Sequence, residues 1–396
     1  MRSDADIAET KPAEHIGPAT VNILLIPDSF KGSLSSARLC AIMKAAAADV
    51  MPQAEVQAFP AADGGEGTLE AVRAAVGGAY VVQTVTGPCG QPVSARYLSS
   101  GDTAYVEMAQ AAGMQYRLPG FSAANTTTFG VGQLIRHALD AGHRRIIVTL
   151  GGSCTNDAGC GMAAALGTRF IAPNGRPFIP TGASLSAILA IQLNPFFFAQ
   201  KAVTVSALCD VTNPLFGPDG AARVFGPQKG ATPEEVTVLD EGMKHLAGLF
   251  AKAKGPRLNV MSGAGAAGGT GAGVVAFLNG KLLSGTDTLL DVMHFPDAAA
   301  KADLIITGEG RVDSQTAGGK LISGVASRAL GRPVVVLTGS IAPGTDLKPL
   351  YDMGVTAVFP VSNGPQTLAE AMAGAAGDVR RTAESVFRLA AALKRE

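Results

Sequence analysis

Four segments of this chain share one plan, in which a short apolar run ends in a glycine-rich polar loop that leads into an expected helix. The fullest example covers residues 303–320, and the others cover 23–33, 59–68 and 146–161. A loop that joins a strand to the start of a helix exposes backbone N–H groups, which suit an anion. Carboxylates at such strand ends suit a hydrated divalent metal or a proton acceptor. The repeated plan therefore predicts a phosphate-handling enzyme.

Composition narrows the class of protein. The chain has 396 residues, which favours two domains, and its 32 Lys+Arg balance 32 Asp+Glu. This balance gives no electrostatic reason to expect nucleic acid or a membrane as partner. No apolar stretch of about 18 residues appears, and the first 20 residues lack the features of a signal peptide. Five scattered cysteines favour reduced thiols and a cytoplasmic location.

The order of the expected elements indicates a discontinuous α/β architecture. Strand–helix units near the start predict a parallel sheet, with Ser33 or Ser35 as the cap of the first helix. The pattern changes after residue 78, and the alternation returns at Asp303 with a strand at 304–307. We therefore expect a Rossmann-like parallel-sheet α/β/α domain with a second α/β domain inserted. The expected ranges are a disordered extension at 1–20, the first domain at 21–85 plus 296–396, and the inserted domain at 86–295. The active-site cleft would lie between the two domains.

Two early loops carry candidate charged groups. Asp28 follows a strand, and Lys31 would hold a phosphate or carboxylate as a point charge. A simple turn with Lys31 in water explains this loop equally well. Asp63 and Glu66 lie three apart among glycines, so that one would bind the water shell of a metal while the other accepts a proton. The alternative is a turn in which Glu66 stabilises a helix start.

The loop after the strand at 146–150 carries further polar groups. Its glycines allow close backbone approach to a ligand, and Ser153, Thr155 and Asn156 would hydrogen-bond a hydroxylated ligand. Asp157 is another acid at a strand end. Cys154 and Cys160 do not have the spacing of a zinc site.

A fifth loop follows the strand at 203–208. Asp210 and Asn213 would face the same cleft, and Arg223 and Lys229 lie downstream at the two ends of a long loop. The alternative is a structural loop with both cations in water, but loops of this length in compact enzymes are often functional.

Residues Gly263, Gly265 and Gly268 match the dinucleotide pattern G-x-G-x-x-G. A poor strand precedes them, and a single match is weak. The match supports an NAD-dependent dehydrogenase only weakly, and we interpret this segment as a backbone cradle for a ligand. No Walker A loop and no protein-kinase motif set occurs in the chain.

The polar loops together resemble the signatures of one family. The matching segments, in order along residues 21–390, are 27–33, 62–68, 151–157, 210–214, 225–231 and 307–316. They are similar to those of the bacterial glycerate kinases of the first type. Cys154, Ala158 and Cys160 depart from the usual residues there, and Lys320 lacks its usual following proline.

The resemblance implies transfer of the ATP γ-phosphate to D-glycerate, with 2-phosphoglycerate as product, in the breakdown of sugar acids and organic acids. Phosphorylation of the 3-hydroxyl, or of a related hydroxy acid, is the first alternative. A non-catalytic sensor of sugar acids or nucleotides is an alternative of another class. The oligomeric state, including a homodimer, is left open.

The expected mechanism assigns a role to each polar group. Mg²⁺ would be held by Asp63, Asp210 or Glu309, and the proton of the attacking hydroxyl would go to a carboxylate, with Asp157 and Asp313 as further candidates. The residues expected to contact substrate or phosphate are Asp28, Lys31, Ser153, Thr155, Asn156, Asn213, Arg223, Lys229, Arg311, Lys320, Gly263, Gly265 and Gly268.

Overall fold

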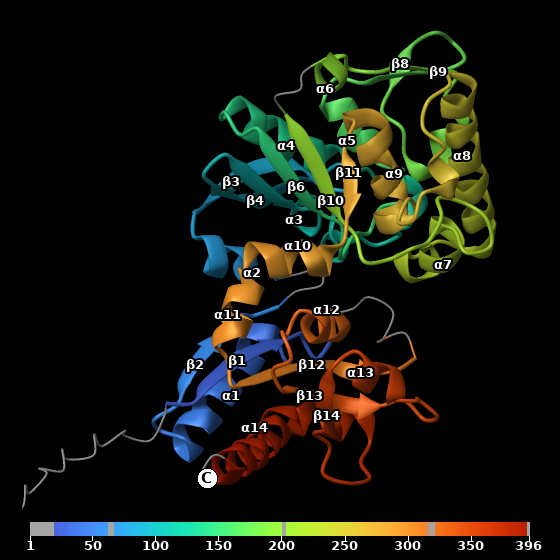
Figure 1. Cartoon of the computed structure of the whole chain (residues 1–396). Helices are drawn as coiled ribbons and strands as arrows, with labels where there is room; N and C mark the ends of the chain where they lie inside the picture. The colour runs from blue at the N-terminus through green and yellow to red at the C-terminus, as the bar shows by residue number, and fades with distance from the viewer. Residues whose placement is uncertain (1–19, 62–66, 200–202, 315, 317–320, 394–396) are drawn as a thin grey trace, which may run out of the picture.

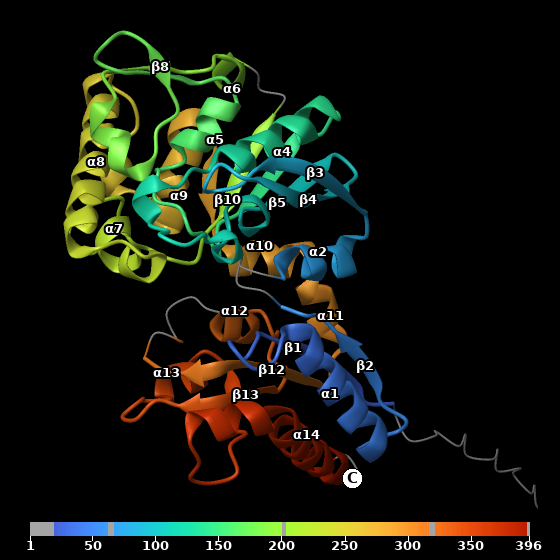
Figure 2. The ribbon, with the colours of Figure 1, turned by 180° about the vertical axis from the view of Figure 1, so that it is seen from behind.

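The protein consists of two α/β bodies stacked end to end, each built on its own sheet (Figures 1 and 2). The computed structural model describes residues 20–61, 67–199, 203–314, 316 and 321–393. Asp63, Glu66 and Lys320 lie outside these residues, as does most of the expected N-terminal extension. Among the described residues, no helix is both long and apolar enough to cross a membrane.

The first body contains a five-stranded sheet in the order β14-β13-β12-β1-β2, and every neighbouring pair is parallel. The strands are β1 (Asn22–Pro27), β2 (Glu55–Ala58), β12 (Leu304–Val312), β13 (Val334–Ile341) and β14 (Val355–Pro360). The sheet therefore joins the two ends of the chain. Residues of β1 are almost fully buried on both faces, which is typical of a parallel sheet covered by helices.

Helices cover both faces of this sheet. Ile23 and Leu25 pack with α1 (Ser36–Val50) and α14 (Leu368–Leu393), whereas Leu24 and Ile26 pack with α11 (Phe295–Lys301) and α12 (Leu321–Ser327). Of the two predicted caps, Ser33 and Ser35, it is Ser35 that caps α1, by accepting a hydrogen bond from the N–H of Arg38. The short α13 (Lys348–Asp352) precedes β14.

The second body contains a six-stranded mixed sheet in the order β11-β10-β6-β5-β4-β3. Its strands are β3 (Ala79–Thr86), β4 (Pro92–Ser100), β5 (Thr103–Glu107), β6 (Arg145–Thr149), β10 (Thr204–Leu208) and β11 (Lys281–Leu283). The four strands β5, β6, β10 and β11 are parallel to one another. Strands β3 and β4 pair antiparallel at one edge, and β4 is also antiparallel to β5. The carboxyl ends of β5, β6, β10 and β11 therefore lie at one edge of the sheet.

Helices also cover both faces of the second sheet. One face packs on α4 (Phe129–Asp140), α5 (Cys160–Ala165) and α9 (Ala266–Leu278). The other face packs on α2 (Thr68–Val76) and α10 (Gly285–Val292), which lie between the two bodies (Figure 1). The remaining elements are α3 (Ala109–Ala112), α6 (Phe196–Ala199), α7 (Ala221–Phe225), α8 (Pro233–Lys252) and a three-stranded sheet of β7 (Arg169–Ile171), β8 (Pro177–Phe178) and β9 (Ala190–Gln192).

The structure confirms the α/β class and the discontinuous first sheet. Strand β3 differs from expectation, because residues 79–85 were placed with the first domain but pair with β4 in the second sheet. Strand β12 is longer than the predicted 304–307, because it continues pairing with β13 as far as Val312. The exact division into domains stays a prediction.

Candidate active site

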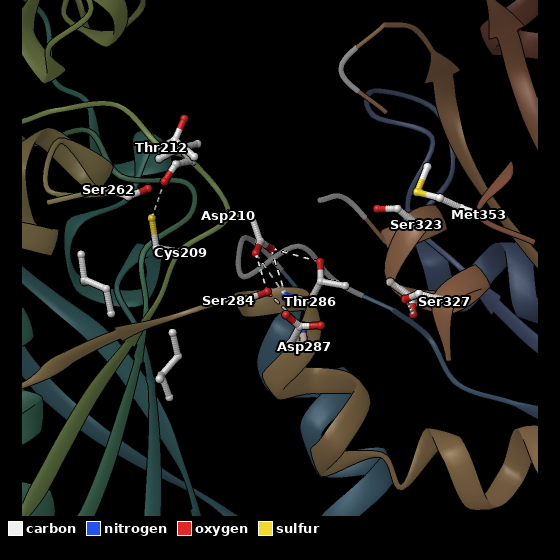
Figure 3. A pocket seen from close by; sticks show the side chains of 14 residues that line it. Cys209, Asp210, Thr212, Ser262, Ser284, Thr286, Asp287, Ser323, Ser327 and Met353 are labelled. Carbon is white, nitrogen blue, oxygen red and sulfur yellow. Dashed lines mark hydrogen bonds between the residues drawn. The ribbon is translucent and has the colours of Figure 1, made fainter. Parts of the chain in front are cut away.

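A pocket of about 590 Å³ lies between the two bodies (Figure 3). One wall comes from the second body, at the carboxyl ends of β10 and β11 and the start of α10, and includes Asp210, Ser284 and Thr286. The opposite wall comes from the first body and includes Ser323 and Gly324 of α12. Among the described residues, the lining consists of Cys209, Asp210, Val211, Thr212, Ser262, Leu282, Leu283, Ser284, Thr286, Asp287, Ser323, Gly324, Ser327 and Met353.

Asp210 is the predicted acid that lines this pocket. Its Oδ1 accepts hydrogen bonds from the N–H of Gly285 at 2.8 Å and from the hydroxyl of Ser284 at 3.3 Å. Its Oδ2 accepts from the N–H of Thr286 at 3.1 Å and from the Thr286 hydroxyl at 3.2 Å. Burial raises the pKa of Asp210, whereas these hydrogen bonds lower it. The carboxylate thus caps α10 from a distant part of the chain.

Asp157 occupies a different environment. Its side chain is fully buried, and its Oδ2 accepts from the N–H and hydroxyl of Thr128, both at 2.8 Å, and from the N–H of Gly161 at 3.0 Å. Its Oδ1 accepts from the N–H of Gly159 at 3.1 Å. Burial raises the pKa of Asp157, while the hydrogen bonds act in the opposite direction. Such a carboxylate fixes the loop after β6 to the start of α4.

Lys229 is a buried cation beside the same loop. Its Nζ donates to the hydroxyl of Ser153 and to the carbonyl of Thr155, each at 2.9 Å. Both acceptors are uncharged, and burial lowers the pKa of Lys229 to about 8. The Thr155 hydroxyl and both amide atoms of Asn156 are buried without a hydrogen-bond partner in the structure. Unsatisfied buried polar groups are costly, so these atoms are candidates for contact with a polar ligand, although their residues are not among those that line the pocket with Asp210.

The glycine-rich segment before and within α9 packs against these loops. A Cβ at Gly268 would lie 2.0 Å from the Thr155 carbonyl oxygen, and one at Gly263 would lie 2.8 Å from the Cys209 sulfur. Ala267, Gly268 and Gly269 all have positive φ, so the helix is interrupted there. The N–H of Gly265 donates to the carbonyl of Asn213 at 3.0 Å. Predicted segments that are far apart in the sequence are therefore adjacent at this edge.

The first body gathers a second group of predicted residues. The N–H of Asp28 donates to the carbonyl of Gly308 at 2.8 Å, which links the loop after β1 to β12. The Thr316 hydroxyl donates to Glu309 Oε1 at 2.6 Å and accepts from the N–H of Asp313 at 3.0 Å. The side chains of Lys31 and Arg311 are exposed.

The predicted residues therefore form two groups. Asp210 lines the pocket, and the second body places Ser153, Thr155, Asn156 and Lys229 together. Two further predicted residues of the second body bind elsewhere: Asn213 donates to the carbonyl of Asp219 at 2.9 Å, and Arg223 pairs with Asp240 at 3.2 Å. The first body contains Asp28, Lys31, Glu309, Arg311 and Asp313, none of which is among the residues that line the pocket.

The sequence reasoning missed Glu107. This residue ends β5, its side chain is almost fully buried, and its Oε2 accepts from the N–H of Leu69 near the start of α2 at 3.4 Å. A carboxylate at the carboxyl end of a strand was the same signal that marked Asp28 and Asp210.

The described residues contain no group of three or more His, Cys, Asp or Glu side chains that would form a metal cage. The Asp210 carboxylate in the pocket wall still fits Mg²⁺, because that ion keeps several waters and binds through one or two carboxylates together with substrate phosphates. The molecule has two α/β bodies, each with polar loops at the carboxyl edge of its sheet, and a pocket lies between the bodies. This arrangement defines an enzyme that acts on a small polar ligand.

Comparisons with known proteins identify the family. The family model described as the glycerate kinase family matches residues 23–391. A glycerate kinase of Bacillus cereus is 41% identical over 92% of this chain and 97% of its own length. The glycerate 2-kinase of Escherichia coli K12 is 39% identical, again over 92% of this chain and 97% of its own.

A solved structure agrees with the sequence relatives. A crystal structure from Salmonella typhimurium LT2, assigned as glycerate kinase 2, has a TM-score of 0.81 and 40% identity, and covers 96% of this chain and 100% of that chain. The chain belongs to the glycerate kinase family.

Proposed function

We propose that this protein transfers the γ-phosphoryl group of ATP to the 2-hydroxyl of D-glycerate, giving 2-phosphoglycerate and ADP. The observation that carries the proposal is the pocket between the two bodies, lined by Asp210, in a chain whose match to the family spans 23–391. Phosphoryl transfer needs mainly positioning and neutralisation of charge, and a polar pocket between two bodies provides for both.

We assign Asp210 a role in binding the metal ion. Mg²⁺ bound with the nucleotide would neutralise charge on the phosphates, and Asp210 would hold it through water. Four donor groups fix the orientation of the Asp210 carboxylate at the pocket wall, so it needs little reorganisation. Glu309 and Asp63 stay predicted metal ligands.

We assign Lys229 to binding of the glycerate carboxylate. Its ammonium contacts two uncharged acceptors, and the neighbouring Thr155 hydroxyl and Asn156 amide are without partners in the structure. A substrate with a carboxylate and two hydroxyl groups matches these donors and acceptors. Lys31, Arg311 and Lys320 stay predicted ligands of substrate or phosphate.

We propose a structural role for Asp157 instead of the role of base. Unlike the side chains of Thr155 and Asn156, both carboxylate oxygens of Asp157 already accept hydrogen bonds, which come from Thr128, Gly159 and Gly161. A base must reach the proton that it removes. Asp313 and Asp63 stay the predicted candidates for that step.

The 3-hydroxyl of glycerate, or a related hydroxy acid, is the alternative acceptor, and a non-catalytic sensor is the alternative of another class. The dehydrogenase alternative loses support, because the 3₁₀ turn Leu258–Val260, instead of a strand, precedes Gly263. We also propose a cytoplasmic location, where ATP is abundant and the free cysteines stay reduced. A homodimer stays a prediction.

The test is ³¹P NMR of the full-length protein with D-glycerate, ATP and Mg²⁺. We expect ADP together with a phosphomonoester whose coupling pattern identifies the 2-position. Omission of glycerate measures background ATP hydrolysis. A 3-phosphoglycerate signal would contradict the regiochemistry, and no phosphoglycerate at all would favour the sensor.

A further inference from the structure

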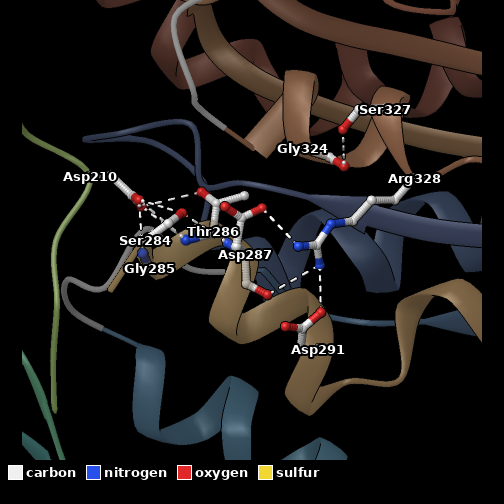
Figure 4. Close-up of polar contacts among 9 residues, drawn as sticks. All are labelled: Asp210, Ser284, Gly285, Thr286, Asp287, Asp291, Gly324, Ser327 and Arg328. Carbon is white, nitrogen blue, oxygen red and sulfur yellow. Dashed lines mark hydrogen bonds and ion pairs between the residues drawn. The ribbon is translucent and has the colours of Figure 1, made fainter. Parts of the chain in front are cut away.

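Helix α10 is attached to both bodies of the molecule. Its start is capped by Asp210 at the end of β10, as described above. Its side is bound by Arg328, the residue that follows α12 in the first body (Figure 4). The Arg328 Nη2 lies 3.0 Å from Asp287 Oδ1, and its Nη1 donates to Asp291 Oδ1 at 2.7 Å and to the Asp287 carbonyl at 3.2 Å. One guanidinium therefore connects α12 to two successive turns of α10.

The two helices touch next to this ion-pair cluster. A Cβ at Gly324 of α12 would lie 2.6 Å from Cγ2 of Thr286, so α12 approaches α10 more closely there than a larger residue would allow. Gly324 and Thr286 both line the pocket. So do Ser327, which precedes Arg328, and Asp287, the α10 residue that pairs with it. The contact between α10 and α12 therefore joins the two walls of the pocket.

Arg328 acts on geometry more than on stability. The side-chain exposures are 26% for Arg328, 55% for Asp287 and 68% for Asp291, and ion pairs this exposed contribute little to stability. A planar guanidinium with three acceptors nevertheless fixes both distance and orientation, which a flexible ammonium cannot do. A small error in the placement of binding groups is enough to weaken a site.

We propose that Arg328 is a positioning residue for the reaction. It sets the spacing of the α12 wall against the α10 wall and thereby the affinity of the pocket for substrates. The kinetic part of this inference depends on the proposed kinase function. The structural part, that Arg328 holds α12 on α10, does not.

The kinetic test compares Arg328→Ala with Arg332→Ala. Arg332 is a matched control, because it is an exposed arginine whose Nη2 donates to the Ala300 carbonyl of α11 and which does not line the pocket. We expect Arg328→Ala to raise KM for ATP or glycerate about tenfold with kcat within about twofold, because it removes binding geometry and leaves the reacting groups in place. Arg328→Lys should lie between Arg328→Ala and the wild type.

A double-mutant cycle identifies the partners. In an Asp287→Asn/Asp291→Asn background, Arg328→Ala should raise KM much less than it does in the wild type, because both ion pairs are already lost and only the hydrogen bond to the Asp287 carbonyl remains. Equal KM values in Arg328→Ala and Arg332→Ala would overturn the proposal. A parallel fall in kcat and in the urea midpoint of unfolding, with no rise in KM, would also overturn it, because it indicates a general structural defect.

Hydrogen exchange gives a result that does not depend on activity. Amides of α10 and α12 should exchange faster in Arg328→Ala than in Arg332→Ala, while those of α8 should be unchanged. If the wild-type protein does not phosphorylate glycerate, the proposed function is wrong, and the exchange rates alone decide whether Arg328 fixes the two helices. Unchanged exchange in α10 and α12 would refute the role of Arg328 in either case.

Discussion

At the scale of single residues, Lys229 is the most informative side chain. It is a buried cation whose hydrogen-bond partners, Ser153 and the Thr155 carbonyl, are uncharged. A buried ammonium without a hydrogen-bonded carboxylate is costly to maintain, and burial lowers its pKa to about 8. Asp157 acts on the ammonium only through its charge, which raises the pKa, whereas an anionic substrate group would add a hydrogen-bonded negative charge.

This pKa makes substrate binding dependent on pH. Above a pKa of about 8 the ammonium loses its proton and its charge. We therefore expect KM for glycerate to rise by up to about tenfold per pH unit above that value. In Lys229→Arg, whose guanidinium stays charged, this rise should be absent. Steady-state kinetics between about pH 6.5 and 9.5 measure both enzymes. A wild-type KM that does not change with pH would contradict the role of Lys229.

The lowered pKa of Lys229 also makes the free energy of unfolding depend on pH. Because the pKa of Lys229 is lower in the folded state than its ordinary 10.5, the unfolded state binds more protons between about pH 8 and 10.5. The contribution of this residue to stability therefore increases with pH across that window. Loss of activity above pH 8 would then reflect substrate binding and not unfolding at this site.

At the scale of elements, β12 shows how glycines allow a strand to continue. The sequence predicted a strand that stops at Thr307 and a loop after it. The strand instead runs to Val312, because Gly308 and Gly339 allow β12 and β13 to approach closely. A Cβ at Gly308 would lie only 1.9 Å from the carbonyl oxygen of Leu337. Glu309 is therefore held by a paired strand.

The close approach predicts an effect on stability. Gly308→Ala should lower the free energy of unfolding by about 1–3 kcal/mol, because the added methyl group forces the two strands apart. Gly248→Ala is the matched control, since nothing lies within 4 Å of a Cβ there and the residue is inside α8. That substitution should stabilise by about 0.5–1 kcal/mol through helix propensity. Urea denaturation of both variants checks the difference, and similar free energies would contradict it.

Local patterns allowed most strands to be predicted, and long-range contacts explain what was missed. The buried strands stood out as short apolar runs, and Ser35 as a helix cap. Helix α9 was not predicted, because glycines and apolar residues fill it without periodicity and Ala267–Gly269 interrupts it. Helix α10 was also missed, although Ser284 caps its start locally by accepting a hydrogen bond from the N–H of Asp287. The second acceptor at this helix start, Asp210, lies 75 positions before Gly285 and could not be paired with it from the sequence.

The candidate site was predictable in residue type but not in role. Strand-end carboxylates and glycine loops marked Asp210 and the loop after β6, which the structure places at one edge of the second sheet. Burial decides the role of each acid, and burial is not visible in a single sequence. Asp157 resembled a base, yet four donors surround it.

At the scale of the whole molecule, the pocket draws its walls from both bodies, so a bound nucleotide should stabilise them together. We expect Mg²⁺ and ADP, at a free concentration about 100-fold above Kd, to raise the free energy of unfolding by about 2.7 kcal/mol. Asp210→Asn should reduce this gain strongly, because the amide cannot replace the carboxylate at the pocket wall. Urea denaturation with and without ligand measures the gain. Equal gains in both proteins would contradict the placement of the nucleotide.

The pairing of β1 with β12 has a consequence for how the protein is made. The N–H of Asn22 donates to Asp303 across 281 positions of sequence. At roughly 5–20 residues per second of translation, the first strand waits on the order of 15–60 s for its neighbour to emerge. The six-stranded sheet is complete before that moment, so it is free to fold while β1 still lacks β12 and has only β2 to pair with. Premature termination before Leu304 would leave the apolar β1 exposed and prone to aggregation.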